Sequence, residues 1–194
     1  PNIIKKNVVN KNQIFAGFGQ QDAHEFFINI IDLLEESINE EIKENSNIVV
    51  INNTPAEKLI SILFDCKITS VIECSETSDK SLTKTNEKIL SISIPNQEIV
   101  TLDDCINEFS KKELLEGDNK WFNEKLNKYV PAHKCMIVRN CPKYLIIHLK
   151  RFEFYRSASK IGREINVSYD WKFKNCLYQL RGCVLQTGSV LGGH

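Results

Sequence analysis

The sequence predicts an α+β fold that combines one long amphipathic helix with an antiparallel sheet. Apolar residues recur at helical spacing from Phe26 to Ile42, and charged residues occupy the other faces of this segment. Three short runs rich in β-branched and aromatic residues follow at 90–94, 144–152 and 178–185, each bounded by turn residues. A long helix followed by separated strands is typical of an α+β fold rather than of alternating parallel units.

The composition narrows the class of protein. With 194 residues, of which 42% are hydrophobic, the chain is long enough to bury a core without crosslinks. Its 25 basic and 25 acidic residues cancel, which argues against a nucleic acid or an anionic membrane as the partner. No apolar run is long enough to cross a bilayer, and residues 1–13 do not resemble a signal peptide. Seven irregularly spaced cysteines indicate reduced thiols. We therefore expect an intracellular protein, cytoplasmic or nuclear.

The long helix is predicted to begin in the motif GFGQQDAHEFF, at about residue 22. Asp22 is an oxygen-bearing residue followed three positions later by Glu25, which is the pattern of a helix N-terminus. Acidic residues there also interact favourably with the helix dipole. Helix capping is thus one explanation for this polar cluster.

The rest of the chain predicts shorter elements. Residues 45–58 are rich in asparagine and indicate a loop, whereas 102–109 and 111–115 indicate two short helices. The closing stretch QTGSVLGGH contains three glycines. Closely spaced glycines let the backbone approach a ligand or move as a flap.

On sequence pattern alone, the histidines and cysteines give only weak indications of a catalytic or metal-binding site. His24 and His194 stand beside the polar cluster and the glycine loop, but a single histidine is more often structural. Cys74 could begin a zinc site, which needs paired thiolates, yet Thr77 occupies the partner position and no Cys-x-x-Cys occurs. The other cysteines lie in apolar or strand-like patterns, without the helix-opening context expected of a nucleophile.

Four motifs in this order, GFGQQDAHEFF, LFDCKITSVIEC, YLIIHLKRF and YQLRGCVLQTGSVLGGH, resemble the catalytic domain of ubiquitin-specific proteases. The resemblance implies a papain-like cysteine protease with a thumb, a palm and fingers. Residues 1–194 would form a partial catalytic domain of this architecture. The thumb helices would occupy about 14–62, the fingers mainly 63–135 and the palm mainly 136–194.

The same resemblance implies a deubiquitinating cysteine protease, which cleaves the bond after the C-terminal glycine of ubiquitin. His194 would be the general base, and the implied partners are ubiquitin and ubiquitinated proteins. Asp22 and Glu25 would line the channel that receives the basic tail of ubiquitin. Gly192 and Gly193 would let this narrow channel close over a tail without side chains.

The sequence departs from the family pattern at the nucleophile. In the family the Cys box lies upstream of the QQDAHEF-like motif, and nothing resembling it precedes Gly17. The chain thus carries the histidine base without the nucleophile, and we expect it to be inactive as it stands. The alternative is a non-catalytic pseudoenzyme that binds ubiquitin.

The sequence also departs from the pattern at the finger zinc site, which many family members build from two Cys-x-x-Cys pairs. The corresponding positions here are Cys74, Thr77, Asn123 and Leu126. One thiolate cannot hold structural zinc with useful affinity. We therefore expect no metal and no other cofactor, and a structural Cys/His metal module, the third interpretation, fails on ligand spacing.

Overall fold

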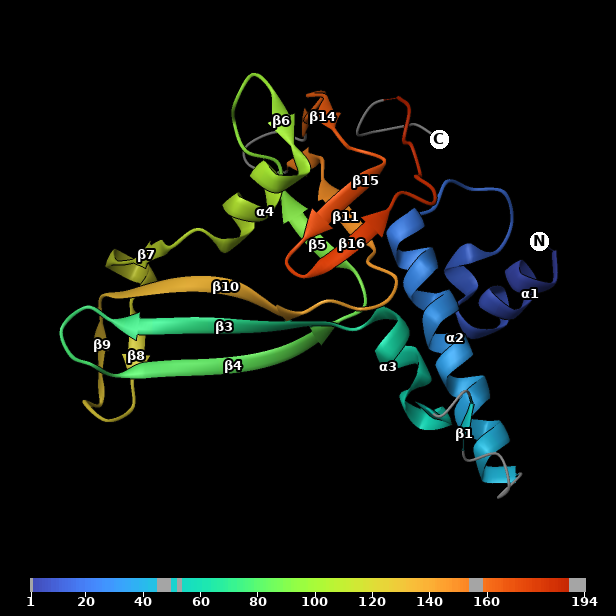
Figure 1. The fold of residues 1–194 in the computed structure, drawn as a ribbon, viewed down its shortest axis with the longest axis horizontal. Coiled ribbons are helices and arrows are strands. Elements are labelled where there is room, and N and C mark those ends of the chain that lie inside the picture. The colour runs from blue at the N-terminus through green and yellow to red at the C-terminus, as the bar shows by residue number, and fades with distance from the viewer. Residues whose placement is uncertain (1, 45–49, 52–53, 154–158, 189–194) are drawn as a thin grey trace.

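The computed structural model describes residues 2–44, 50–51, 54–153 and 159–188 (Figure 1). Three of the four described α-helices gather at one end, and a long sheet extends away from them. The fourth helix and several short strands lie beside the base of that sheet, whereas one short strand pair lies at its far end. The helices are α1 (Asn2–Lys11), α2 (Ala23–Glu44), α3 (Leu59–Phe64) and α4 (Leu102–Ser110), with 3-10 turns η1 (Gln13–Phe15), η2 (Ala56–Lys58) and η3 (Gly117–Asn119). None of the described helices could span a membrane.

The long helix α2 confirms the prediction from apolar periodicity. Its start is capped as expected, because Oδ1 of Asp22 accepts hydrogen bonds from the N–H groups of His24 (2.7 Å) and Glu25 (3.3 Å). The ring of Phe15 packs edge-on against that of Phe26, with centroids 5.3 Å apart. Each of α1, η1 and α2 contributes one buried residue, namely Val8, Phe15 and Ile31. The helix α1 itself was not predicted.

The largest sheet is antiparallel, as predicted, with strand order β4-β3-β10-β7. Its strands are β3 (Cys66–Cys74), β4 (Lys80–Glu87), β7 (Glu113–Leu115) and β10 (Ala132–Asn140). The predicted helix at 111–115 is therefore wrong. Lys111 takes an extended conformation after α4, and the residues that follow pair with β10. Pairing with an available strand edge outweighs the weak helical preference of so short a segment.

Two strand pairs are parallel, which the sequence did not predict. Strand β5 (Leu90–Ser93) pairs with β11 (Ile147–Lys150), and β6 (Val100–Thr101) pairs with β14 (Ile165–Asn166). The predicted strand at 90–94 is thus confirmed, whereas the run at 144–152 holds β11 and the start of a separate strand, β12.

The remaining strands form antiparallel pairs: β1 (Val50–Ile51) with β2 (Thr54–Pro55), β8 (Trp121–Asn123) with β9 (Lys128–Val130), β12 (Phe152–Glu153) with β13 (Ser159–Lys160), and β15 (Asp170–Phe173) with β16 (Cys176–Gln179). The predicted loop at 45–58 therefore contains β1, β2 and η2 in its described part. The strand predicted at 178–185 is largely wrong. The paired strand β16 ends at Gln179, opposite Asp170. The N–H of Leu180 still donates a hydrogen bond to the Tyr169 carbonyl, but Val184 and Leu185 are exposed.

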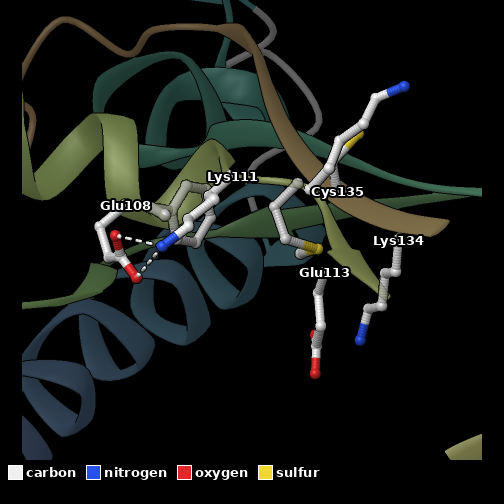
Figure 2. Close-up of a pocket in the computed structure, with 8 residues that line it drawn as sticks. Glu108, Lys111, Glu113, Lys134 and Cys135 are labelled. Carbon is white, nitrogen blue, oxygen red and sulfur yellow. Dashed lines mark hydrogen bonds and ion pairs between the residues drawn. The ribbon is translucent and has the colours of Figure 1, made fainter. Parts of the chain in front are cut away.

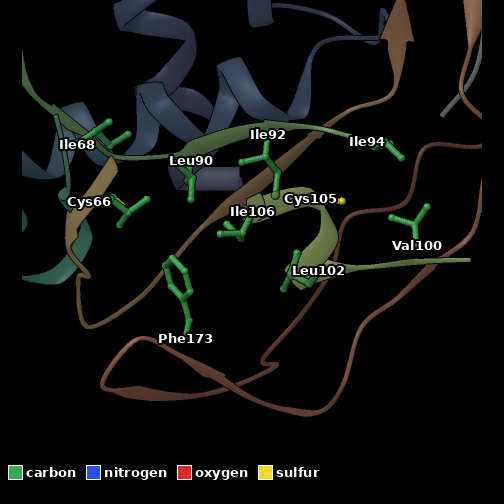
Figure 3. Packing of buried hydrophobic residues seen from close by; sticks show 11 residues of the cluster. Cys66, Ile68, Leu90, Ile92, Ile94, Val100, Leu102, Cys105, Ile106 and Phe173 are labelled. Carbon is green, nitrogen blue, oxygen red and sulfur yellow. The ribbon is translucent and has the colours of Figure 1, made fainter. Parts of the chain in front are cut away.

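The hydrophobic core lies where β5, α4 and the base of the long sheet meet (Figure 3). Thr101 caps α4 in a reciprocal pair with Asp104, which fixes the start of this helix against the core. Buried core residues come from β3, β5, the segment between β5 and α4, α4 itself, β10 and β15; they are Cys66, Ile68, Leu90, Ile92, Ile94, Val100, Leu102, Cys105, Ile106, Val138 and Phe173.

Candidate functional site

The turn that precedes α2 is anchored to α1. Gly17 has a φ of 77°, in the left-handed region that favours glycine. The Lys5 ammonium donates a hydrogen bond to the Gly17 carbonyl at 2.7 Å and lies 5.2 Å from the ring centre of Phe18. The motif GFGQQDAHEFF therefore has a defined shape before the helix begins.

The acids of this motif, Asp22 and Glu25, are both exposed at the start of α2. Asp22 uses one carboxylate oxygen as the helix cap. Glu25 does not complete a reciprocal capping box: among the described residues, no hydrogen bond or ion pair involves its carboxylate. Capping therefore explains Asp22 and leaves the Glu25 carboxylate available to a ligand.

The start of α2 lies against the strand β11. The imidazole rings of His24 and His148 are stacked, with centroids 4.5 Å apart and planes 20° apart. Nδ1 of His148 also lies 3.2 Å from the hydroxyl of Ser91 on β5. The stack brings the first and third sequence motifs together, a contact that the sequence analysis missed.

Lys160 connects β13 to the start of the glycine loop. Its ammonium donates hydrogen bonds to the carbonyls of Gln186 (2.9 Å) and Gly188 (3.0 Å). Gly188 has a φ of 99°, which explains a glycine at this position. The other predicted site residues, His194, Gly192 and Gly193, lie outside the described residues. No motif pointed to Lys160.

The four positions of the degenerate zinc site meet at the far end of the long sheet together with Asp79 and Lys125. We call this group the tip cluster: Cys74, Thr77, Asp79, Asn123, Lys125 and Leu126. The Asp79 carboxylate accepts hydrogen bonds from Thr77 (2.9 Å), Asn123 (3.0 Å) and Lys125 (2.7 Å). These bonds lower the pKa of Asp79 to about 2, and the bond from Lys125 has the largest effect. The tip cluster was not predicted as a network, because neither Asp79 nor Lys125 belongs to a motif.

The donors in the tip cluster do not fit zinc. Cys74 offers a thiol. The main cause that lowers the pKa of this thiol is a hydrogen bond with Thr77. The other positions offer a hydroxyl, an amide and the aliphatic side chain of Leu126. The Lys125 ammonium adds a positive charge, which would repel a cation. Within the described part of the chain, no group of three or more His, Cys, Asp or Glu is placed to hold a metal.

Burial makes several cysteine thiols poor nucleophiles. Cys66 and Cys105 are 1% and 0% exposed. Burial is the main cause that raises the pKa of Cys66 to about 12 and the pKa values of Cys105 and Cys141 above the ordinary value. A raised pKa leaves little thiolate at neutral pH, so these thiols suit packing better than catalysis.

A cavity of about 360 Å³ lies between α4, β7 and β10 (Figure 2). Among its lining residues, Glu108 and Lys111 form an ion pair at 3.4 Å. Glu113 and Lys134 face each other in the strand register. Neither Asp22 nor Glu25 lines this cavity, so it does not coincide with the acids at the start of α2.

Comparison with known proteins agrees with the fold and the motifs. The family model "Ubiquitin carboxyl-terminal hydrolase" matches residues 1–194. Ubiquitin carboxyl-terminal hydrolase 4 of Candida glabrata is 30% identical over 81% of this chain and 20% of its own length. Ubiquitin carboxyl-terminal hydrolase 8 of Saccharomyces cerevisiae is 28% identical over 94% of this chain and 43% of its own length. This chain thus spans less than half the length of these relatives.

Solved structures show the same architecture. A chain of the SAGA DUB module, a Ubp8 variant with Sgf11, Sus1 and Sgf73 bound to monoubiquitin, superposes with a TM-score of 0.78 at 28% identity, covering 98% of this chain and 43% of that one. The corresponding Ubp8 module with ubiquitin aldehyde gives a TM-score of 0.77 at 27% identity, over 98% of this chain and 44% of that one. These matches confirm the predicted papain-like fold with thumb, palm and fingers. The chain therefore belongs to the ubiquitin carboxyl-terminal hydrolase family.

Proposed function

We propose that the protein is a deubiquitinating cysteine protease that cleaves the bond after the C-terminal glycine of ubiquitin. The observation that carries the proposal is the exposed Glu25 carboxylate, which has no partner among the described residues and stands at the start of α2, where His24 stacks against β11. A carboxylate in this position can bind a basic peptide tail through charge-assisted hydrogen bonds. The solved neighbours bound to monoubiquitin and ubiquitin aldehyde support ubiquitin as the ligand.

In this proposal Asp22 and Glu25 hold the tail, and Gly192 and Gly193 leave room for its terminal glycines. His194 takes the proton of a cysteine thiol supplied by a part of the protein outside this chain. The thiolate attacks the carbonyl of the terminal glycine, and the imidazolium protonates the departing amine. Water then hydrolyses the thioester, with the imidazole again taking a proton, and this restores the thiol.

The first experiment tests for a competent nucleophile. The full-length protein is incubated with ubiquitin that carries a thiol-reactive electrophile at its C-terminus, and its intact mass is measured. We expect one covalent adduct, on a cysteine outside residues 1–194, and a greatly reduced rate of labelling in His194→Ala. Absence of the adduct, under conditions that fully label a known deubiquitinase, would favour the ubiquitin-binding pseudoenzyme.

The second experiment tests the role of Glu25. Glu25→Gln in the full-length protein should weaken ubiquitin binding by about tenfold, because a charge-assisted hydrogen bond contributes about 1.5–3 kcal/mol. The melting temperature should stay nearly unchanged, since the carboxylate has no described partner and loses only a small interaction with the helix dipole. Glu40→Gln, on an exposed position of the same helix, is the matched control. Equal losses of stability and binding in Glu25→Gln would instead support a purely structural role.

A further inference from the structure

The stack of His24 on His148 lies at the start of α2, beside the two acids that we propose bind ubiquitin. His24 lies between Asp22 and Glu25 in sequence, on the first turn of α2, and His148 lies in the middle of β11. Further along α2, Asp32 and Glu35 bind Lys88, which precedes β5. The helix is therefore held to the parallel strand pair by an ion-pair cluster along its length and by two imidazoles at its start.

The surroundings of His148 favour its uncharged form. Burial is the main cause that lowers the pKa of His148; His24 and Lys150 lower it further, and Asp22 opposes them. The groups that face His148 are thus His24 on α2, Asp22 just before that helix, Ser91 on β5 and Lys150 on its own strand. Two rings at 4.5 Å attract one another while neutral, but they repel when both carry a proton.

We propose that the His24–His148 stack is a proton-sensitive joint that positions Asp22 and Glu25 for the ubiquitin tail near neutral pH and releases them in acid. His148 is then a positioning residue, which acts on the substrate through His24 and the first turn of α2. The part of the proposal that concerns ubiquitin rests on the proposed function, whereas the joint itself can be tested without ubiquitin.

The direction of the pH dependence follows from the lowered pKa. The unfolded chain binds a proton on His148 at a higher pH than the folded chain does, so acid favours the unfolded state. The stability that neutral, half-buried His148 contributes is fully present above the ordinary histidine pKa of about 6.5. It is lost as the pH falls through the lower, folded pKa.

A double-mutant cycle on this chain tests the joint. The variants His24→Gln, His148→Gln and the double variant are unfolded with denaturant at about pH 7.5 and about pH 5.5. We expect a favourable coupling between the two positions at the higher pH that disappears or changes sign at the lower one. His133→Gln, at an exposed position on β10, controls for histidine titration elsewhere. A coupling that is the same at both pH values would overturn the proposal.

Ubiquitin binding to the full-length protein tests the consequence. The affinity of the wild type should fall about three- to tenfold between about pH 7.5 and about pH 5.5, a range in which histidine titrates. His148→Gln and His24→Gln should flatten this dependence, whereas His133→Gln should keep it. A wild-type profile retained in both stack variants would refute the positioning role. Failure to bind ubiquitin at both pH values would refute the proposed function and, with it, this positioning role. The double-mutant cycle would still show whether the His24–His148 stack is proton-sensitive.

Discussion

Ile92→Ala should lower the free energy of unfolding by about 2–5 kcal/mol, the range for removing a large aliphatic side chain from a packed core. Ile92 is 0% exposed and lies on β5, opposite Leu149 of the parallel partner strand. Figure 3 shows it among side chains from α4 and β3. Truncation would leave a cavity. The strands β5 and β11 cannot readily close it, because the hydrogen bonds between them fix the backbone.

Equilibrium unfolding in urea would measure this loss. Ile99→Ala is the matched control, since Ile99 is 70% exposed and its truncation should change stability by no more than about 0.5 kcal/mol. Similar effects of the two substitutions would contradict the placement of the core around β5.

Asn123→Ala should destabilise the tip cluster by about 1–3 kcal/mol, the cost of leaving buried polar groups without partners. Asn123 is 1% exposed. Its Oδ1 accepts hydrogen bonds from the backbone N–H groups of Lys125 (3.0 Å) and Leu126 (3.2 Å), and its Nδ2 donates to Asp79 at 3.0 Å. We propose that this network holds the tip of the long sheet without a metal ion.

Thermal unfolding and amide hydrogen exchange would measure the change at the tip. Asn119→Ala, at an exposed position near the same hairpin, is the control and should behave as wild type. Treatment with a zinc chelator should leave the wild-type melting temperature unchanged. A chelator-induced loss of stability, or stoichiometric zinc in the purified protein, would overturn the metal-free tip.

Local patterns predicted the elements whose stability is local. The helix α2 was predicted because its apolar periodicity is long. The short helix predicted at 102–109 is α4, whose start is fixed locally by Thr101 and Asp104 within one turn. The helix α1 escaped prediction because it buries one residue, Val8, and presents a weak pattern. Strand β7 and the parallel pairing of β5 with β11 depend on partners that are distant in sequence, which no local pattern encodes.

In the candidate site, too, local contacts could be predicted from the sequence and distant ones could not. The capping role of Asp22 could be predicted because donor and acceptor lie within three residues of one another. The stack of His24 on His148 could not, since each histidine on its own fits a structural role. The contacts of Lys160 could not be predicted either, because its partners are backbone carbonyls, which every residue carries whatever its side chain.

The parallel pairing of β5 with β11 also bears on how the chain reaches its native state. These strands are separated by α4, β7, the β8–β9 hairpin and β10, so a long loop must close before either strand gains from the contact. The hairpin of β3 with β4 joins neighbouring segments and needs no such closure. We therefore expect the β3–β4 hairpin to form early, and the core around β5, which needs the long loop to close, to form later.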